Sequence, residues 1–163
     1  MTADKWNKIA DMNERRCDTG CTVYEGKIVV SGGWKLNSVE TYDYYENKWT
    51  HLADMIEERQ SHSSVSMGNK LFLFPGSRNS TCEVFDSFSR LFYYIEANEG
   101  FTYDMLSFHA VGISNQIIII CKMLDTSKTK LFTYNVETND WKLINCCTTL
   151  KKKHGFNCAK YHQ

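Results

Sequence analysis

Neither sign of charge is in excess in this sequence of 163 residues, because nineteen lysines and arginines balance nineteen aspartates and glutamates. Nucleic-acid binding depends on a basic excess that neutralises phosphates, so we expect no nucleic-acid partner. Long apolar runs are also missing. The longest, Ile117 to Cys121, fits one buried strand and is far too short to cross a membrane. The N-terminal residues lack the apolar stretch of a signal peptide, so we expect a cytoplasmic protein without a membrane partner.

Motifs of metal binding and catalysis are absent as well. The seven cysteines include no CxxC pair of the kind that holds zinc, and several lie in apolar strand patterns where cysteine acts as a small buried hydrophobe. No G-x-S-x-G nucleophile motif and no phosphate-binding glycine loop occurs. The sequence therefore predicts no enzyme, no cofactor and no metal site.

An internal repeat is what the sequence does contain. Trp6 opens WNKIADMNERR and Trp49 opens WTHLADMIEER forty-three residues later, and both phrases share ADM and an arginine ten residues after the tryptophan. Phe92 takes the tryptophan position in the next unit, and Trp141 takes it in the one after that. Repetition at a nearly fixed period of this length indicates an array of similar structural units.

Each unit is predicted to form four short antiparallel strands, separated by turn signals such as Glu25-Gly26 and Gly68-Asn69. The expected strands are 18–24, 27–31, 39–43 and 48–52, then 62–67, 70–74, 81–85 and 90–95, then 107–113, 116–121, 130–134 and 140–144. The expected units are 17–59, 60–102 and 103–150, with the end of a preceding unit at 1–16 and the start of a further one at 151–163. No amphipathic helix is expected, so the predicted fold class is all-β.

The repeated phrase resembles the kelch repeat, in which an apolar strand ends in Gly-Gly and is followed by V-E-x-Y-D, a tryptophan and M-x-x-x-R. The first unit carries these residues nearly complete, as Gly32, Gly33, Tyr42, Asp43, Trp49, Met55 and Arg59. The second unit keeps Phe74-Pro75-Gly76 in place of the glycine pair, and the third has lost the glycines at Ile120-Cys121-Lys122. The resemblance implies a kelch β-propeller of four-stranded antiparallel blades. A closed ring takes typically four to eight blades, so we expect here an incomplete ring of about three to four.

The residues that carry the resemblance have structural roles by their chemistry. A glycine pair permits positive φ and close approach of another backbone segment. Tyr42, Trp49 and Trp141 supply large apolar area between neighbouring blades. Arg16 and Arg59 can each donate several hydrogen bonds to loop carbonyls and so lock one blade to the next.

Three histidines, His62, His109 and His154, occupy corresponding places at the starts of strands in the alignment of the units. Such a set could indicate a metal ion in a central channel. Blades fan around an axis, however, so equivalent side chains need not converge, and hydrogen-bonded histidines are the expectation.

The similarity is greatest to kelch-like proteins, in which a propeller follows BTB and BACK domains. In that family the BTB part binds a cullin scaffold, and the propeller captures a protein substrate for ubiquitination. The resemblance thus implies a protein-binding substrate adaptor of a cullin-type ubiquitin ligase. The alternatives are an actin-binding cytoskeletal module and a truncated fragment without function. BTB and BACK segments are not visible, and we expect either a fragment or a ring completed by another chain.

The resemblance also implies where a protein partner or peptide segment would bind. In kelch-like relatives this is the face built by the loops between second and third strands and the loops that link blades. By motif position the candidate residues are Arg16, Lys35, Asn37, Ser38, Arg59, Gln60, Ser61, Arg78, Asn79, Ser80, Lys128 and Lys152. Their mixture of basic and small polar side chains suits an acidic or polar peptide.

Overall fold

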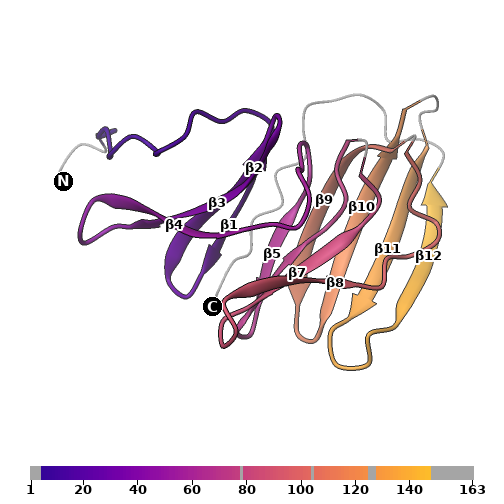
Figure 1. The fold of residues 1–163 in the computed structure, drawn as a ribbon. Coiled ribbons are helices and arrows are strands. Elements are labelled where there is room, and N and C mark those ends of the chain that lie inside the picture. Colours follow the sequence, from indigo (N-terminus) through magenta and orange to yellow (C-terminus); the bar gives the residue numbers. More distant parts are fainter. Residues whose placement is uncertain (1–4, 78, 104, 125–127, 148–163) are drawn as a thin grey trace.

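The computed structural model describes residues 5–77, 79–103, 105–124 and 128–147, and it contains twelve strands in three four-stranded sheets (Figure 1). Blade 1 consists of β1 (Gly20–Tyr24), β2 (Lys27–Gly33), β3 (Leu36–Asp43) and β4 (Lys48–Asp54). Blade 2 consists of β5 (Ser64–Met67), β6 (Lys70–Leu73), β7 (Cys82–Asp86) and β8 (Leu91–Ile95). Blade 3 consists of β9 (Met105–Ile113), β10 (Gln116–Met123), β11 (Thr129–Asn135) and β12 (Trp141–Cys147).

Each blade is an antiparallel meander in which strands pair in chain order, as the sequence predicts. All twelve strands lie where they are expected, with ends that differ by a few residues. The first strands of blades 1 and 2 begin later than predicted, at Gly20 and Ser64. The residues before them bond elsewhere, because the Ser61 amide donates to the Asp18 carbonyl at 2.8 Å. No helix in the described part of the chain is long and apolar enough to cross a membrane.

The turn between the third and fourth strands is closed in the same way in all three blades. A carboxylate or amide oxygen of Asp43, Asp86 or Asn135 accepts hydrogen bonds from the backbone N–H groups two and three residues further on. This side-chain cap is the local reason why the repeat places aspartate or asparagine there. For Asp43, the neighbouring Lys27 and these amides hold the pKa of the carboxyl below its usual value.

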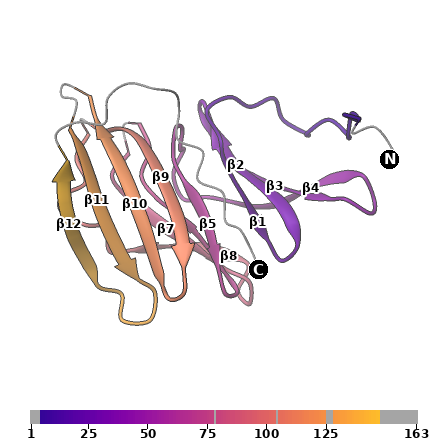
Figure 2. The ribbon, with the colours of Figure 1, turned by 180° about the vertical axis from the view of Figure 1, so that it is seen from behind.

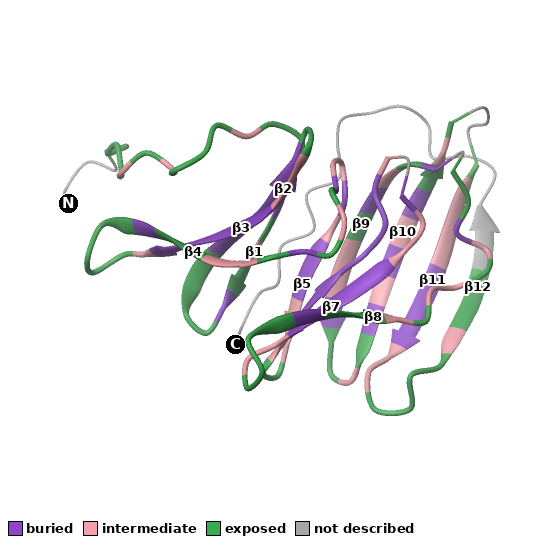
Figure 3. Ribbon diagram, viewed as in Figure 1, coloured by how far each residue is buried: buried purple, intermediate pink, exposed green. Residues whose placement is uncertain are grey.

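The core lies between the blades, so each sheet is buried where it faces a neighbour (Figure 3). Between blades 1 and 2 the side chains of Val29, Leu71 and Phe85 are almost entirely excluded from solvent. Between blades 2 and 3 the core is larger and richer in aromatic rings, and Phe101 contacts Phe132 with ring centroids 4.9 Å apart. β1 packs against β5, and β5 packs against β9, so the first strands lie innermost (Figure 2).

The predicted aromatic pair recurs in the first and third blades. The rings of Tyr42 and Trp49 lie 5.1 Å apart, and those of Tyr134 and Trp141 lie 4.7 Å apart. Each indole N–H donates to a carbonyl of the segment that precedes the blade, Ala10 for Trp49 and Glu96 for Trp141. The tryptophans therefore hold the incoming chain to the blade as well as filling the core.

Gly32 and Gly33 have the positive φ values of 57° and 126° that the motif predicts. A Cβ atom on Gly32 would lie 2.4 Å from the carbonyl oxygen of Arg59, and one on Gly33 would lie 2.9 Å from that of Cys17. The amide of Gly33 donates to the same Arg59 carbonyl at 2.8 Å. The glycine pair thus lets the link between blades lie directly on the end of β2.

Strand register corrects the alignment of the histidines. The pair Leu71↔Phe85 of blade 2 and the pair Ile117↔Tyr134 of blade 3 occupy equivalent positions in their sheets. In blade 3 the pairing of Ile120 with His109 then fixes how the first strand aligns with the second. The residue that corresponds to His62 is therefore Phe108, and the expected match with His109 is wrong by one position. Trp141 follows Phe92 by 49 residues, whereas Phe92 follows Trp49 by 43, so the third unit has extra residues. Strand register shows how these extra residues are divided between the linker before β9 and the β10–β11 connection. His154 lies outside the described residues.

Candidate protein-binding face

The two repeat arginines lie in the interior of the structure. The Arg16 guanidinium contacts the Glu40 carboxylate at 2.7 Å and donates to the carbonyls of Gly32 and Ser38, and its side chain has no exposed surface. Burial raises the pKa of Glu40, but hydrogen bonds from Arg16 and from Asn13 outweigh this and hold it below the usual value. The predicted locking role of the arginine is therefore what its contacts show.

Arg59 repeats this arrangement one blade further on. Its guanidinium lies 2.7 Å from the Glu83 carboxylate, and both side chains are fully buried. It also donates to the Thr81 carbonyl and to the side-chain oxygen of Asn79. In blade 3 the position of Glu40 and Glu83 is taken by Phe132, which pairs with Ile119 as Glu83 pairs with Leu73. Each arginine pairs with the acidic residue of the blade that follows it, and the arginine position before blade 3, ten residues after Phe92, is Thr102. Both partners of the pair are therefore replaced at the start of blade 3.

The predicted loops come together at one end of the blades. The β2–β3, β6–β7 and β10–β11 connections lie at this end, and so do the starts of the inner strands, because Gly20 pairs with Ser31 and Ser107 pairs with Lys122. The links between blades reach the same place, since the Ser77 amide donates to the Gln60 carbonyl. Loops distant in sequence therefore form one face, which we call the loop face.

A hollow of about 310 Å³ opens at the starts of the three inner strands on the loop face. Its lining is mainly hydroxyl, imidazole and carboxylate groups, with one thiol and one phenyl ring. The lining residues are Asp18, Thr19, Gly20, Cys21, Ser61, His62, Ser63, Ser64, Ser107, Phe108 and His109. Such a surface offers many hydrogen-bond donors and acceptors alongside its apolar area.

The predicted binding residues divide into three groups by exposure. Lys35 and Lys128 are exposed, and the Lys35 ammonium lies 5.2 Å from the centre of the exposed Trp34 ring. The half-buried ones are Asn37, Gln60, Ser61 and Ser80, and the buried side chains are Arg16, Ser38, Arg59 and Asn79. Arg78 and Lys152 lie outside the described residues. Because the buried group is engaged in the arginine networks, the exposed part of the face is smaller than the motif positions predict.

Comparison with known proteins agrees with this architecture. The Kelch motif family model matches residues 15–56. The chain is also similar to the solved structure of YjhT, with a TM-score of 0.74 at 14% identity over 89% of this chain. Residues 15–56 thus carry a Kelch motif, and the chain as a whole has the fold of β-propeller blades. It is 37% identical over 76 residues to Kelch-like protein 41b of Danio rerio, which is 44% of this chain.

These relatives are longer than the kelch segment described here. The matched region spans 13% of Kelch-like protein 41b, and the chain covers 56% of the YjhT structure. The likeness to YjhT concerns the fold. The described residues contain three complete four-stranded blades and no closed ring.

Several residues of the hollow could not be found from the motif. Ser107 and His109 lie on β9, and Ser63 lies directly before β5, so none of them belongs to the loops that the kelch resemblance points to. The sequence signal is weak, since they are simply polar residues at the start of strands. What brings them together is the convergence of the first strands on the axis, which only the packing of the blades produces.

One buried polar cluster beside the hollow pairs a serine with a histidine. Ser31 Oγ lies 2.7 Å from His62 Nε2 and 2.7 Å from Ser64 Oγ. Ser31 has no exposed surface, so the cluster cannot present its hydroxyl to a substrate as a nucleophile must. Burial lowers the pKa of His62 to about 3, with a smaller effect of the nearby Arg59 charge. Among the described residues no three His, Cys, Asp or Glu side chains are arranged to hold a metal ion.

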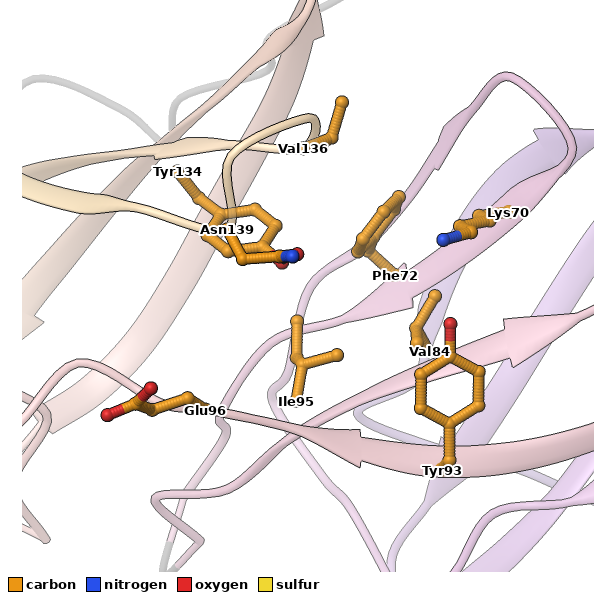
Figure 4. A pocket seen from close by; sticks show the side chains of 9 residues that line it. All are labelled: Lys70, Phe72, Val84, Tyr93, Ile95, Glu96, Tyr134, Val136 and Asn139. Carbon is orange, nitrogen blue, oxygen red and sulfur yellow. The ribbon is translucent and has the colours of Figure 1, made fainter.

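A second hollow, of about 300 Å³, lies between β8 and the β11–β12 turn (Figure 4). Figure 4 shows the side chains of Phe72, Ile95 and Val136 around it, with Lys70 and Glu96 on opposite sides. It belongs to the seam between blades 2 and 3, at the end of the strands away from the loop face. No motif of the repeat points to it.

Proposed function

We propose that the loop face of this kelch segment binds a protein partner through an acidic or polar peptide segment. The observation that carries the proposal is the hollow at the starts of the inner strands, which is lined by hydroxyl and imidazole groups and opens at the same end of the blades as the loops of Lys35 and Lys128. A peptide carboxylate or amide placed there meets donors from all three blades. The exposed Lys35 and Lys128 supply positive charge on the loop face, which favours acidic peptides at low ionic strength.

The contacts of the blades support this choice of face over the rest of the surface. Loops on a rigid scaffold are the usual place of binding residues. The scaffold under this face is held by the buried arginine networks, so the hollow is largely preformed and little ordering is needed on binding. The hollow at the other end of the blades is lined mostly by strand residues, among them Phe72, Val84 and Ile95.

The experiment is a selection of peptides from a library of random acidic and neutral segments on the purified chain, followed by calorimetry with the best peptide. Two substitutions test the face, Lys35→Glu in the β2–β3 connection and Ser107→Glu in the hollow. Each is expected to weaken binding by at least tenfold, and higher salt is expected to weaken it further. Lys70→Glu, at the opposite end, is the matched control and should leave the affinity unchanged.

Two results would refute the proposal. One is a selection that enriches no peptide. The other is a peptide whose affinity depends on Lys70 but on neither Lys35 nor Ser107, because that peptide would occupy the other end of the blades.

The likeness to a kelch-like protein supports a finer proposal, that the partner is a substrate presented to a cullin-type ubiquitin ligase. The test is whether a cullin co-purifies with a longer gene product that joins this segment to BTB and BACK domains. Actin binding is the alternative that the kelch resemblance implies. Co-sedimentation of the chain with actin filaments, abolished by Lys35→Glu, would replace the ligase proposal with the cytoskeletal one.

A further inference from the structure

The hollow of about 300 Å³ between blades 2 and 3, which we call the seam hollow, has a lining that departs from the repeat. Val84 of β7 and Tyr93 of β8 pair across the sheet and line it. The corresponding pair in blade 1 is Thr41 and Thr50, whose hydroxyl oxygens are hydrogen-bonded at 3.0 Å. The seam hollow thus has an apolar wall where blade 1 has two hydroxyl groups.

The first strand of blade 2 explains why there is space at this seam. Between blades 1 and 2, the Tyr24 ring at the end of β1 lies against Phe85, with ring centroids 6.0 Å apart. Met67 stands at the corresponding end of β5. A Cβ atom on Gly112 would lie 2.7 Å from Met67 Cε, so the Met67 side chain packs on β9, and it does not line the seam hollow. The ring that occupies the first seam is therefore replaced by a thinner side chain at the second.

The ammonium group of Lys70 lies at the seam hollow without a carboxylate partner. In blade 1 the corresponding Lys27 ammonium lies 3.0 Å from the Asp43 carboxylate. Among the described residues no carboxylate lies within ion-pair distance of Lys70. Asp86, at the position of Asp43, accepts hydrogen bonds from the amides of its own turn. Figure 4 shows the amino group of Lys70 directed toward Phe72 and so into the hollow.

The other polar groups around the seam hollow also favour an anion. The Tyr134 hydroxyl donates to the side-chain oxygen of Asn139 at 2.7 Å, which leaves the NH₂ group of that amide to donate elsewhere. Figure 4 shows the Asn139 amide directed toward the middle of the hollow and the Glu96 carboxylate directed away from it. A positive charge and an amide donor therefore stand beside an apolar wall.

We propose that the seam hollow binds a small free carboxylic acid with an apolar aryl or alkyl body. The carboxylate contacts the Lys70 ammonium and the Asn139 amide, and the apolar body lies against the wall that includes Val84. An ion pair beside an apolar wall is partly shielded from water, which strengthens it. One ammonium balances one negative charge, which favours a carboxylate over a phosphate dianion.

The size of the seam hollow limits the ligand to a small molecule, because about 300 Å³ is at the lower end of the range for ligand sites. The inference goes beyond the peptide-binding proposal and is independent of it, since the seam hollow and the loop face lie at opposite ends of the blades.

The first experiment is calorimetric titration of the chain with 3-phenylpropionate, indole-3-acetate and octanoate. At least one of these acids should bind in a one-to-one ratio. Its neutral amide should bind more weakly by about tenfold or more, because it lacks the charge that pairs with Lys70. Failure of all three acids to bind, or equal affinity for an acid and its amide, would overturn the proposal.

Two further probes test the class of ligand. Phenyl phosphate should bind more weakly than 3-phenylpropionate because its second charge has no partner. N-acetyl-glycyl-glycyl-phenylalanine should also bind more weakly, because a peptide chain exceeds the space. Tighter binding of the phosphate would assign the hollow to phosphate esters, and tighter binding of the peptide would assign it to the C-terminus of a protein. Either result would overturn the proposal of a free carboxylic acid.

Substitutions test the position of the site. Lys70→Met keeps an unbranched side chain but removes the charge, so it should weaken binding by about tenfold or more. Lys27→Met, at the corresponding lysine of blade 1, is the matched control and should leave the affinity unchanged. Lys35→Glu should also leave it unchanged, which distinguishes this site from the loop face. Unchanged affinity in Lys70→Met, or an equal loss in either control, would contradict the assignment to the seam hollow.

Methyl resonances in nuclear magnetic resonance spectra locate the ligand without any substitution. On titration with the acid that binds, the methyl signals of Ile95 and Val136 should shift because both residues line the seam hollow. Those of Val23 and Ile28, at exposed positions of blade 1, are the internal controls and should stay in place. Shifts at Val23 and Ile28 without shifts at Ile95 and Val136 would place the ligand on blade 1 and overturn the proposal.

Discussion

The guanidinium of Arg59 and the carboxylate of Glu83 lie 2.7 Å apart with neither side chain exposed, and this pair links the end of blade 1 to the middle of blade 2. The same pair recurs between Arg16 and Glu40, and it is absent from blade 3, where Phe132 takes the acidic position. The first two blades are therefore held to their incoming segments by charge, and the third by aromatic packing.

Removing one partner of the buried pair should strongly destabilise the fold. Glu83→Gln leaves the Arg59 charge without its counterion in a site that water does not reach. The free energy of unfolding should fall by about 3–5 kcal/mol, as measured by urea denaturation. Lys8→Ala removes an exposed ion pair with Asp11 and serves as control, with no measurable change expected. Equal midpoints for Glu83→Gln and the unchanged chain would show that the pair is dispensable.

The stability of the segment should depend on pH through His62. Burial lowers the pKa of this side chain to about 3 in the folded state, whereas the unfolded chain titrates near its ordinary value of 6.5. The unfolded state therefore binds the proton first, so stability is complete above about pH 6.5 and declines as the pH falls toward 3. The loss between pH 7 and pH 5 should be about 2 kcal/mol.

His62→Gln keeps a hydrogen-bonding group near Ser31 but cannot titrate, so it should remove this pH dependence. His109→Gln, at an exposed histidine, is the control for the change of side chain alone. Parallel stability curves for the unchanged chain and His62→Gln between pH 5 and 7 would contradict the assignment to His62.

Two glycines have nearly equal φ but different surroundings, so substituting them distinguishes the cost of a left-handed backbone from the cost of a close contact. Gly32 and Gly68 have φ values of 57° and 60°. A Cβ on Gly32 would meet the Arg59 carbonyl oxygen at 2.4 Å, whereas one on Gly68 would meet nothing within 4 Å. Gly68→Ala should therefore lower the free energy of unfolding by about 1 kcal/mol, through the left-handed backbone alone. Gly32→Ala should lower it several times as much, because the close contact is added. Thermal or urea unfolding measures the loss of stability in each variant. Equal losses for Gly32→Ala and Gly68→Ala would refute the prediction.

The cysteines should differ sharply in reactivity. Burial raises the pKa of Cys82 to about 12 and also raises that of Cys121, and neither thiol is exposed. Cys17 and Cys21 are exposed and should be alkylated by iodoacetamide at pH 8 in the folded chain, while Cys82 and Cys121 react only in denaturant. Peptide mapping by mass spectrometry distinguishes the sites. Rapid labelling of Cys82 without denaturant would show that the seam between blades 2 and 3 opens.

The repeat in the sequence was sufficient to predict the blades and their structural residues. Gly32, Tyr42, Trp49 and the two arginines have local or nearest-neighbour roles, and a period of forty-three residues marks them. The match of His62 with His109 failed because strand register depends on how the extra residues of the third unit are shared between loops. Sequence spacing alone cannot locate insertions within polar stretches.

The sequence by itself determined an all-β chain of three four-stranded blades, because strand alternation, turn residues and the repeated phrase are local signals. Only the tertiary structure decided which predicted binding residues are exposed. Arg16, Arg59 and Asn79 look like loop residues in the sequence, but their donors and acceptors are taken up by buried partners distant along the chain. The hollow of the loop face and the seam hollow likewise arise from how whole sheets pack. Burial is a property of that packing and has no local pattern in the sequence.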